Sequence, residues 1–226
     1  MTDRSVSAKT YFMPAVKNQS TSPNGLALEK ILSAAEVEFS EKGFDGAGMK
    51  ALALRAGVSQ SLLHYHFGSK DKLYEAVIRE RSALINEERL SLLAQIDLSE
   101  ENAADQIVQA LVAPALGPAG GGRAYARIFA GLIAGNARDQ ALVKEFYDPT
   151  AQKFIEAIEI ALGGVDRVVA AQVYQFALGV LASVISRDGR IERLMGDASE
   201  PLKDNALIAQ LTQFVVGGAR SIAQQN

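Results

Sequence analysis

The residues best suited to do chemistry in this chain gather in one short stretch of its N-terminal half. His64 and His66 are the only histidines, and they flank Tyr65 shortly after a polar pair, Gln60 and Ser61. Amide and hydroxyl groups such as those of Gln60 and Ser61 can hydrogen-bond to base edges when a helix presents them to a groove. These two residues are therefore candidates for contact with nucleic acid.

Local charge supports the same interpretation, although the whole chain carries a net charge of −3. Residues 47–72 contain four cations and one anion, which gives a local charge of +3. A phosphate backbone responds to local charge more than to the total. Lys70 begins a helix, where a cation is unfavourable to the helix dipole, so we expect it to have an anionic partner. We expect Arg55 to form a salt bridge within the chain. The charged residues of this stretch are Lys50, Arg55, Lys70 and Lys72, opposed by Asp71.

Enzymatic function has little support in the sequence. There is no cysteine, and no histidine outside the pair described above, so a cysteine nucleophile, a thiolate metal site and a His-rich zinc site are excluded. The glycine cluster at 120–122 lacks the preceding strand and the following Lys-Ser/Thr of a nucleotide-binding loop. We therefore expect no enzymatic activity, no metal and no cofactor.

The elements that must position these residues are short helices. A composition rich in Ala, Leu, Ile, Gln and Glu, with six prolines and no tryptophan, favours an all-α protein. Apolar residues repeat every three or four positions over 28–39 and again over 49–56. Gly57 allows a turn, and Ser59 can cap a second short helix over 60–67. Two short helices joined by a glycine-containing turn form a helix-turn-helix.

Four short motifs lie at fixed spacing within residues 29–77: Phe39 with Gly43-Phe44, Ala56-Gly57-Val58-Ser59, His64-Tyr65-His66-Phe67, and Gly68-Ser69-Lys70 followed by Leu73. Together they resemble the N-terminal domain of the TetR family of transcriptional regulators. The resemblance implies an all-α protein in which a three-helix helix-turn-helix DNA-binding domain is joined to a larger C-terminal helical domain for ligand binding and dimerisation. It also implies a double-stranded DNA operator as a partner.

The resemblance assigns DNA contacts to a small set of side chains. The aromatic run also fits an alternative in which it packs the third helix against the first and fourth. We expect this packing role for Phe67 and leave both roles open for His66. The implied contacts are Lys50 to a base or phosphate, Gln60, Ser61 and Leu62 to bases, and His64, Tyr65, His66 and Lys70 to phosphates.

Two positions depart from the family pattern. Many members carry Thr or Ser at the start of the first motif helix, where this chain has Ala47-Gly48, so one backbone contact should be weaker. Leu54 replaces a residue that is usually charged and exposed. The departure at Ala47-Gly48 leaves an alternative function open: a helical protein-interaction module that has kept the fold without specific DNA binding.

The chain divides into a flexible N-terminal arm at 1–24, the helix-turn-helix domain at 25–72, and a helical ligand-binding and dimerisation domain at 73–226. No apolar run reaches the roughly 18 residues of a membrane span, and residues 1–24 lack the apolar core of a secretory signal. We therefore expect a cytoplasmic protein with no membrane partner.

Pro114 should end a helix and open a flexible loop at 114–122. The helices expected after the motif cover 69–93, 99–113, 123–136, a segment from 139, 148–162 capped by Asp148 with Pro149 behind it, 165–186 and 203–223.

The C-terminal half resembles, more weakly, the regulatory domain of a fatty-acid- and drug-responsive branch of the family. The helix at 123–136 is apolar around its whole circumference and must be buried. We expect a largely apolar effector between 123–136, 148–162 and 165–186, with Arg127 or Arg187 able to receive an acidic head. Packing without ligand contact is the alternative for each lining residue. The candidate lining residues are Tyr125, Phe129, Asn136, Tyr147 and Tyr174.

The helix at 203–223 carries an apolar stripe too wide for a monomer's surface helix, so we expect a partner helix. A two-fold homodimer through the last two long helices would read a near-palindromic operator. Together with an effector, this predicts a ligand-responsive repressor. The expected interface residues are Leu207, Leu211, Phe214, Val215 and Gly218.

Overall fold

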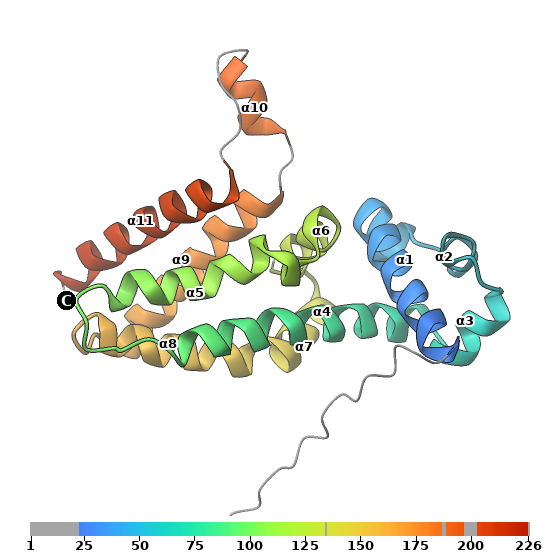
Figure 1. Cartoon of the computed structure of the whole chain (residues 1–226), viewed down its shortest axis with the longest axis horizontal. Helices are drawn as coiled ribbons and strands as arrows, with labels where there is room; N and C mark the ends of the chain where they lie inside the picture. The colour runs from blue at the N-terminus through green and yellow to red at the C-terminus, as the bar shows by residue number, and fades with distance from the viewer. Residues whose placement is uncertain (1–22, 134, 187–188, 197–202, 226) are drawn as a thin grey trace, which may run out of the picture.

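The computed structural model describes residues 23–133, 135–186, 189–196 and 203–225. Every regular element in these ranges is helical, which confirms the all-α prediction (Figure 1). The arm expected at 1–24 lies outside the described residues, apart from its last two positions. The elements are α1 (Pro23–Gly46), α2 (Met49–Ala56), α3 (Gln60–Phe67), α4 (Lys70–Leu93), α5 (Ala103–Leu116), the 3-10 turn η1 (Pro118–Gly120), α6 (Gly122–Ile133), α7 (Ala137–Phe146), α8 (Asp148–Ala161), α9 (Arg167–Ser186), α10 (Arg190–Met195) and α11 (Asp204–Ala223).

Helices α1, α2 and α3 pack together at one end of the molecule (Figure 1). The backbone of α1 leaves the helical region at Gly43, where the sequence predicts its end. Gly57 closes α2 with a φ of 65°, a left-handed conformation that glycine adopts without strain, so the chain can turn sharply into α3. Leu63 of α3 is fully buried in the core that α1 also lines. The predicted helix-turn-helix is confirmed.

Helix α4 joins this end to the rest of the molecule. It begins as predicted, because the Ser69 hydroxyl accepts a hydrogen bond from the Lys72 amide at 3.3 Å and Asp71 lies in the first turn. Its 24 residues correspond to about 36 Å of helix. One end packs against α1 and α3, and the remainder packs against α5, α7 and α8 (Figure 1). The two ends of the protein therefore share one continuous element.

The larger bundle forms around α9, which lies against α5, α6, α8 and α11. By length and composition α9 could cross a membrane, with a mean hydropathy of 1.9 over 167–185. Its position explains that composition, since a helix surrounded by four others must be apolar on several sides.

The flexible loop predicted at 114–122 is wrong. Helix α5 continues through Pro114 to Leu116, and η1 follows directly. The proline is buried in the inner face of α5, so tertiary packing outweighs the hydrogen bond that it cannot donate. Gly120 is also buried, and the guanidinium of Arg81 donates to the Ala119 carbonyl at 3.3 Å. The segment is a packed corner of the molecule.

Helix boundaries also differ from the predictions elsewhere: α5 begins at Ala103 in place of 99, and α9 begins at Arg167 in place of 165. The helix expected at 123–136 ends at Ile133, and Asn136 caps the next helix by accepting from the amides of Arg138 and Asp139 at 3.1 and 3.3 Å. Asn is among the strongest N-cap residues, and this preference prevails over the apolar pattern that precedes it. Helix α8 begins at Asp148, but Tyr147 takes the N-cap position that was expected for Asp148.

Candidate nucleic-acid interface and effector core

The outward face of α3 carries the polar residues that the sequence singled out. Gln60, Ser61, His64 and Tyr65 are exposed, and Tyr65 keeps 81% of its surface accessible. Leu62 between them is half-buried. This arrangement follows from the fully buried Leu63, which fixes the rotation of the helix. Side chains at the start of α3 are therefore free to reach the edges of bases.

The start and the end of α3 are held by side-chain contacts. The Ser59 hydroxyl accepts from the Leu62 amide at 3.1 Å, which confirms the predicted cap. At the other end, Nδ1 of His64 lies 2.9 Å from the Gly68 carbonyl oxygen. These contacts limit the movement of the exposed face, as a reading surface requires.

The cations near α3 differ in how far they are already engaged. Lys50 is exposed in the first turn of α2. Lys70 is half-buried: its Nζ donates to the Ala47 carbonyl at 3.1 Å and lies 4.4 Å from the centroid of the Phe44 ring. These contacts provide a partner for Lys70 within the chain, so its charge near the start of α4 does not by itself require an external anion. Arg55 forms the predicted internal salt bridges, to Glu38 at 2.8 Å and to Glu41 at 2.5 Å.

His66 turns inward, away from the face formed by the other candidates. It is half-buried, and its Nε2 is enclosed without a hydrogen-bond partner in the described part of the chain. Its ring lies 5.3 Å from that of Tyr65 and 6.3 Å from that of Phe67. Of the two roles left open by the sequence, this placement favours packing.

Gly48 offers no side-chain cap to α2, and Leu54 is 82% exposed, in line with the two departures noted in the sequence.

Four of the five expected effector residues lie together in the core of the larger bundle. Tyr125, Phe129, Tyr147 and Tyr174 are all buried. The hydroxyls of Tyr125 and Tyr147 share a hydrogen bond of 2.6 Å, and the Phe129 ring lies edge-on to Tyr147 at 5.5 Å. Burial raises the pKa of Tyr147 to about 12 and that of Tyr125 well above its usual value, so both hydroxyls keep their protons at neutral pH.

The fifth expected residue, Asn136, is not part of this core. It is exposed at the start of α7, because its side chain is used as a helix cap. Arg127 is also exposed, and Arg187 lies outside the described residues. The polar residues that sequence reasoning missed are Asn86 and Arg89 of α4, both buried. The available signal was their spacing: they continue the inner face of α4 that Ile78, Ser82 and Ile85 define at intervals of three and four.

Comparison with known proteins agrees with this geometry. Residues 31–77 match the family described as bacterial regulatory proteins of the tetR family, and residues 105–218 match the tetracyclin repressor-like C-terminal domain. The chain belongs to the TetR family of transcriptional regulators.

Three related proteins illustrate how the similarity is distributed. The transcriptional activator FasR of Mycolicibacterium smegmatis is 46% identical over 50 residues, 22% of this chain and 23% of FasR. The regulator RutR of Escherichia coli K12 is 43% identical over 68 residues, 29% of this chain and 32% of RutR. These alignments therefore span less than a third of either relative. A TetR-like regulator from Rhodococcus sp. RHA1 has the same fold, with a TM-score of 0.62 and 22% identity over 87% of this chain and 97% of that one.

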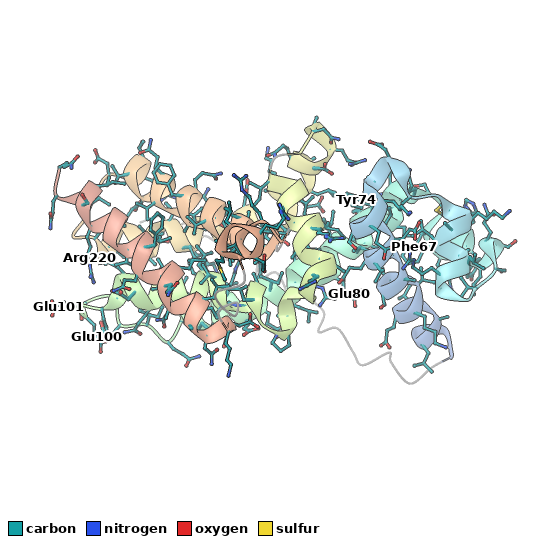
Figure 2. All side chains as sticks on the ribbon, turned by 90° about the horizontal axis from the view of Figure 1, so that it is seen from above. Phe67, Tyr74, Glu80, Glu100, Glu101 and Arg220 are labelled. Atoms are coloured by element: carbon teal, nitrogen blue, oxygen red, sulfur yellow. The ribbon has the colours of Figure 1, made fainter. Side chains whose placement is uncertain are left out.

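In this TetR-family chain, two contacts tie the DNA-binding helices to the larger bundle. The guanidinium of Arg138 on α7 stacks on the Phe44 ring at 3.6 Å and lies 5.0 Å from the centroid of Tyr74, which Figure 2 shows at this junction. The guanidinium of Arg81 on α4 pairs with Glu36 of α1 at 2.8 Å. Helices α4 and α7 therefore each contact α1 through an arginine side chain.

A Cβ at Gly121 would lie 2.7 Å from Arg81 and 2.9 Å from Glu36, and the φ of 70° there suits glycine. The chain beyond η1 therefore packs directly on this ion pair. The same contact that joins α1 to α4 is covered by the start of α6.

The stripe on α11 that suggested a dimer interface has two sides. Phe214 is 72% exposed, Gly218 is exposed and Leu207 is half-buried. Leu211 and Val215 instead lie inside the chain's own core, at 4% and 7% exposure, because α11 packs on α5 and α9. Unlike Phe214, these two side chains therefore offer little surface to a partner. At its far end α11 is held by a salt bridge of 2.7 Å from Arg220 to Asp105 of α5 (Figure 2).

Proposed function

We propose that this TetR-family protein is a ligand-responsive repressor that binds a near-palindromic operator as a homodimer. The observation that carries the proposal is the outward face of α3, where exposed polar side chains lie on a helix whose rotation and ends are fixed. A helix of this kind enters the major groove and presents its N-terminal residues to base edges. Gln60 and Ser61 read bases, and Leu62 contacts a thymine methyl group.

Phosphate contacts hold the domain in register on the duplex. We assign these to Lys50, His64, Tyr65 and Lys70. Lys70 can release the Ala47 carbonyl when a phosphate offers a stronger, charged acceptor. His66 is left to packing. The local charge of +3 around the motif attracts DNA to this end of an otherwise acidic chain.

The dimer forms through the exposed faces of α9 and α11. Besides Phe214 on α11, helix α9 exposes Phe176 at 57% and Val168 at 69%. Large apolar side chains on two adjacent helices are what a partner covers in a helical dimer. A two-fold axis at this face sets the two α3 helices at half-sites about 34–36 Å apart.

The effector binds in the buried core lined by Tyr125, Phe129, Tyr147 and Tyr174. A ligand changes the affinity for DNA only if it binds more tightly to one arrangement of the two DNA-binding domains of the dimer than to another. Helix α4 links the core to those domains, and α6 packs against α1 beside it. We further propose that the protein works in the cytoplasm, where operator DNA is found, with no membrane partner.

A second function has one observation in its favour. Gly48 gives α2 no side-chain cap, and so one expected phosphate contact is lacking. A helical interaction module without specific DNA binding would have this property. Such a module would bind any duplex equally or none.

Selection of bound duplexes from a random pool with purified protein tests both ideas. If the protein is a sequence-specific regulator, one near-palindromic sequence should be enriched. The affinity of the protein for that sequence should fall steeply as the salt concentration rises. Enrichment of no sequence would favour the interaction module. Transcription from a promoter that carries the selected site, measured with and without the protein, then tests repression against activation.

A further inference from the structure

Arg89 of α4 is a fully buried cation whose hydrogen-bonding capacity is only partly used. Its Nε donates to the Leu111 carbonyl at 2.8 Å, while Nη2 is enclosed without an acceptor in the described part of the chain. A guanidinium stays charged and carries five donors, so leaving one unpaired in a core is unfavourable. One turn earlier, Oδ1 of Asn86 is likewise enclosed without a donor. The position therefore destabilises the ligand-free protein unless something else pairs with it.

No carboxylate is among the titratable groups that act on the charge of Arg89. The side chains that act on its charge are Tyr174, Tyr147 and Tyr125, which come from α9, from the junction of α7 and α8, and from α6. One of the two protons of the Tyr125–Tyr147 pair lies in their mutual hydrogen bond. The other has no acceptor in the described contacts, so a ligand oxygen could receive it. Arg89 and these tyrosines thus bring cationic and hydroxyl donors into one buried part of the bundle, and no carboxylate is among the groups that act on the charge of Arg89.

We propose that the effector of this regulator is an organic monocarboxylate whose carboxylate group binds Arg89 between α4, α6 and α9. The inference rests on the proposed function, since it names the chemical class of the ligand for the same core. With Nε used by Leu111, the terminal nitrogens remain for an end-on pair with a carboxylate. A single cation matches a single negative charge, whereas a phosphate monoester would bring a second charge without a partner. The Phe129 ring beside Tyr147 receives the apolar body of the molecule.

The position of Arg89 also explains how ligand binding can affect the DNA-binding helices. Because Nη2 of Arg89 is enclosed, a carboxylate can reach it only if side chains of the surrounding core move. Tyr125 lies on α6, and its ring is 5.9 Å from the guanidinium of Arg81, which pairs with Glu36 of α1. Movement of Tyr125 would therefore act on the contact that sets α1 against α4.

Calorimetry and thermal melting of the purified full chain test the proposal without DNA. The probes are alkanoates of four to twelve carbons and 4-phenylbutyrate, compared with the corresponding primary amides and with alkyl phosphates. We expect carboxylates to bind about 10- to 100-fold more tightly than the amides and more tightly than the phosphates. Equal binding of amides and acids, tighter binding of phosphates, or no binding by any carboxylate would overturn the proposal.

Variants separate a ligand-binding role of Arg89 from a structural one. Arg89→Met should lose the preference for carboxylates and melt at the same or a higher temperature without ligand, because it removes an unpaired charge. A lower melting temperature for this variant together with unchanged carboxylate preference would contradict the proposal. Tyr174→Phe keeps the shape of the core and should weaken carboxylate binding more than amide binding, which provides a second test should Arg89→Met not fold. Arg123→Met, at an exposed arginine of α6, is the control and should bind carboxylates as the unaltered chain does.

These binding measurements are independent of operator binding. Failure to select any duplex, with carboxylates still bound at Arg89, would count against the proposed function and not against the site. Selection of an operator together with loss of any acid preference would do the reverse.

Discussion

The buried carboxylates of the DNA-binding helices are paired with arginines, and so is Asp139 of α7, whereas Arg89, buried in the larger bundle, has no acidic partner in the described part of the chain. Glu38 pairs with Arg55 and Glu36 pairs with Arg81, both at 2.8 Å. Arg89 has no acid among the groups that act on it. Since an uncompensated charge in a core costs several kcal/mol, the first region is complete as it stands and the second is stabilised by a suitable ligand. A DNA-binding surface benefits from rigidity, whereas a ligand-binding core benefits from a buried polar group that only the ligand pairs with.

One helix carries both kinds of charge. Arg81 and Arg89 are separated by eight residues of α4, or about 12 Å along its axis. The paired arginine holds the DNA-binding helices, and the unpaired one lies among the tyrosines of the core. A ligand that binds Arg89 therefore acts on the same rigid element that positions α1, so no long chain of intermediate contacts is needed.

The largest effect is expected at the exposed faces of α9 and α11, where we place the dimer interface. Loss of the dimer should abolish tight operator binding and, with it, the response to ligand. Phe214→Glu puts a charge into the proposed interface and should give a monomer. Operator affinity should fall about 100- to 10,000-fold, because the two half-sites are no longer bound by linked domains. Sedimentation velocity and fluorescence anisotropy measure the two results. Gln213→Glu adds the same charge at an exposed neighbour and should remain dimeric; a dimeric Phe214→Glu protein would disprove this placement.

The rigidity of the reading domain depends on its apolar core. Leu63→Ala should lower the free energy of unfolding by about 2–5 kcal/mol, since a fully buried leucine leaves a cavity in a small domain. Leu54→Ala, on the exposed side of α2, should change it by less than about 0.5 kcal/mol. Urea unfolding followed by circular dichroism measures both. Equal stabilities would mean that α3 is not held by Leu63 as the structure indicates.

Substitutions on the DNA-binding surface should distinguish contacts to bases from contacts to phosphates. Gln60→Ala should cost about 1–3 kcal/mol on the selected operator and change the preferred base there. Lys70→Ala should weaken binding to every duplex and reduce the slope of log affinity against log salt by about 0.9. Anisotropy titrations over a salt series distinguish the two variants, with urea unfolding as the check on Lys70, which also contacts Ala47. An unchanged salt slope would remove Lys70 from the phosphate contacts.

The two regions also differ in what the sequence could predict. Turns and caps such as Gly57, Ser59 and Ser69 act within a few residues, and so the helix-turn-helix could be read directly. Arginine is normally assigned to the surface, so the burial of Arg89 depends on helices that lie far away in the chain. The sequence of α11 is apolar on more than one side, and it cannot indicate that Leu211 faces inward.

Communication between the regions should depend on the junction at α7. Arg138→Ala removes the cation stacked on Phe44 and should reduce the coupling between ligand and operator by about 0.5–2 kcal/mol. The measurement is the ratio of operator affinities with and without a bound ligand. Lys144→Ala, at an exposed position of α7, is the matched control. Unchanged coupling in Arg138→Ala would leave the Arg81–Glu36 pair as the main connection.

The smallest effect is expected at the start of α2, where the reading domain lacks a cap. Gly48 has φ −110° and ψ 143°, and a Cβ there would meet no atom within 4 Å, so a side chain can be added without strain. Gly48→Ser should raise the free energy of unfolding by a few tenths of a kcal/mol, because its hydroxyl can accept from an unpaired amide of the first turn. Gly48→Ala should lower it, since alanine is a poorer cap than glycine. The serine hydroxyl can also donate to a phosphate, so Gly48→Ser should bind all duplexes slightly more tightly, whereas Gly48→Ala should not. Equal unfolding free energies and affinities for the two variants would show that α2 does not need the missing cap.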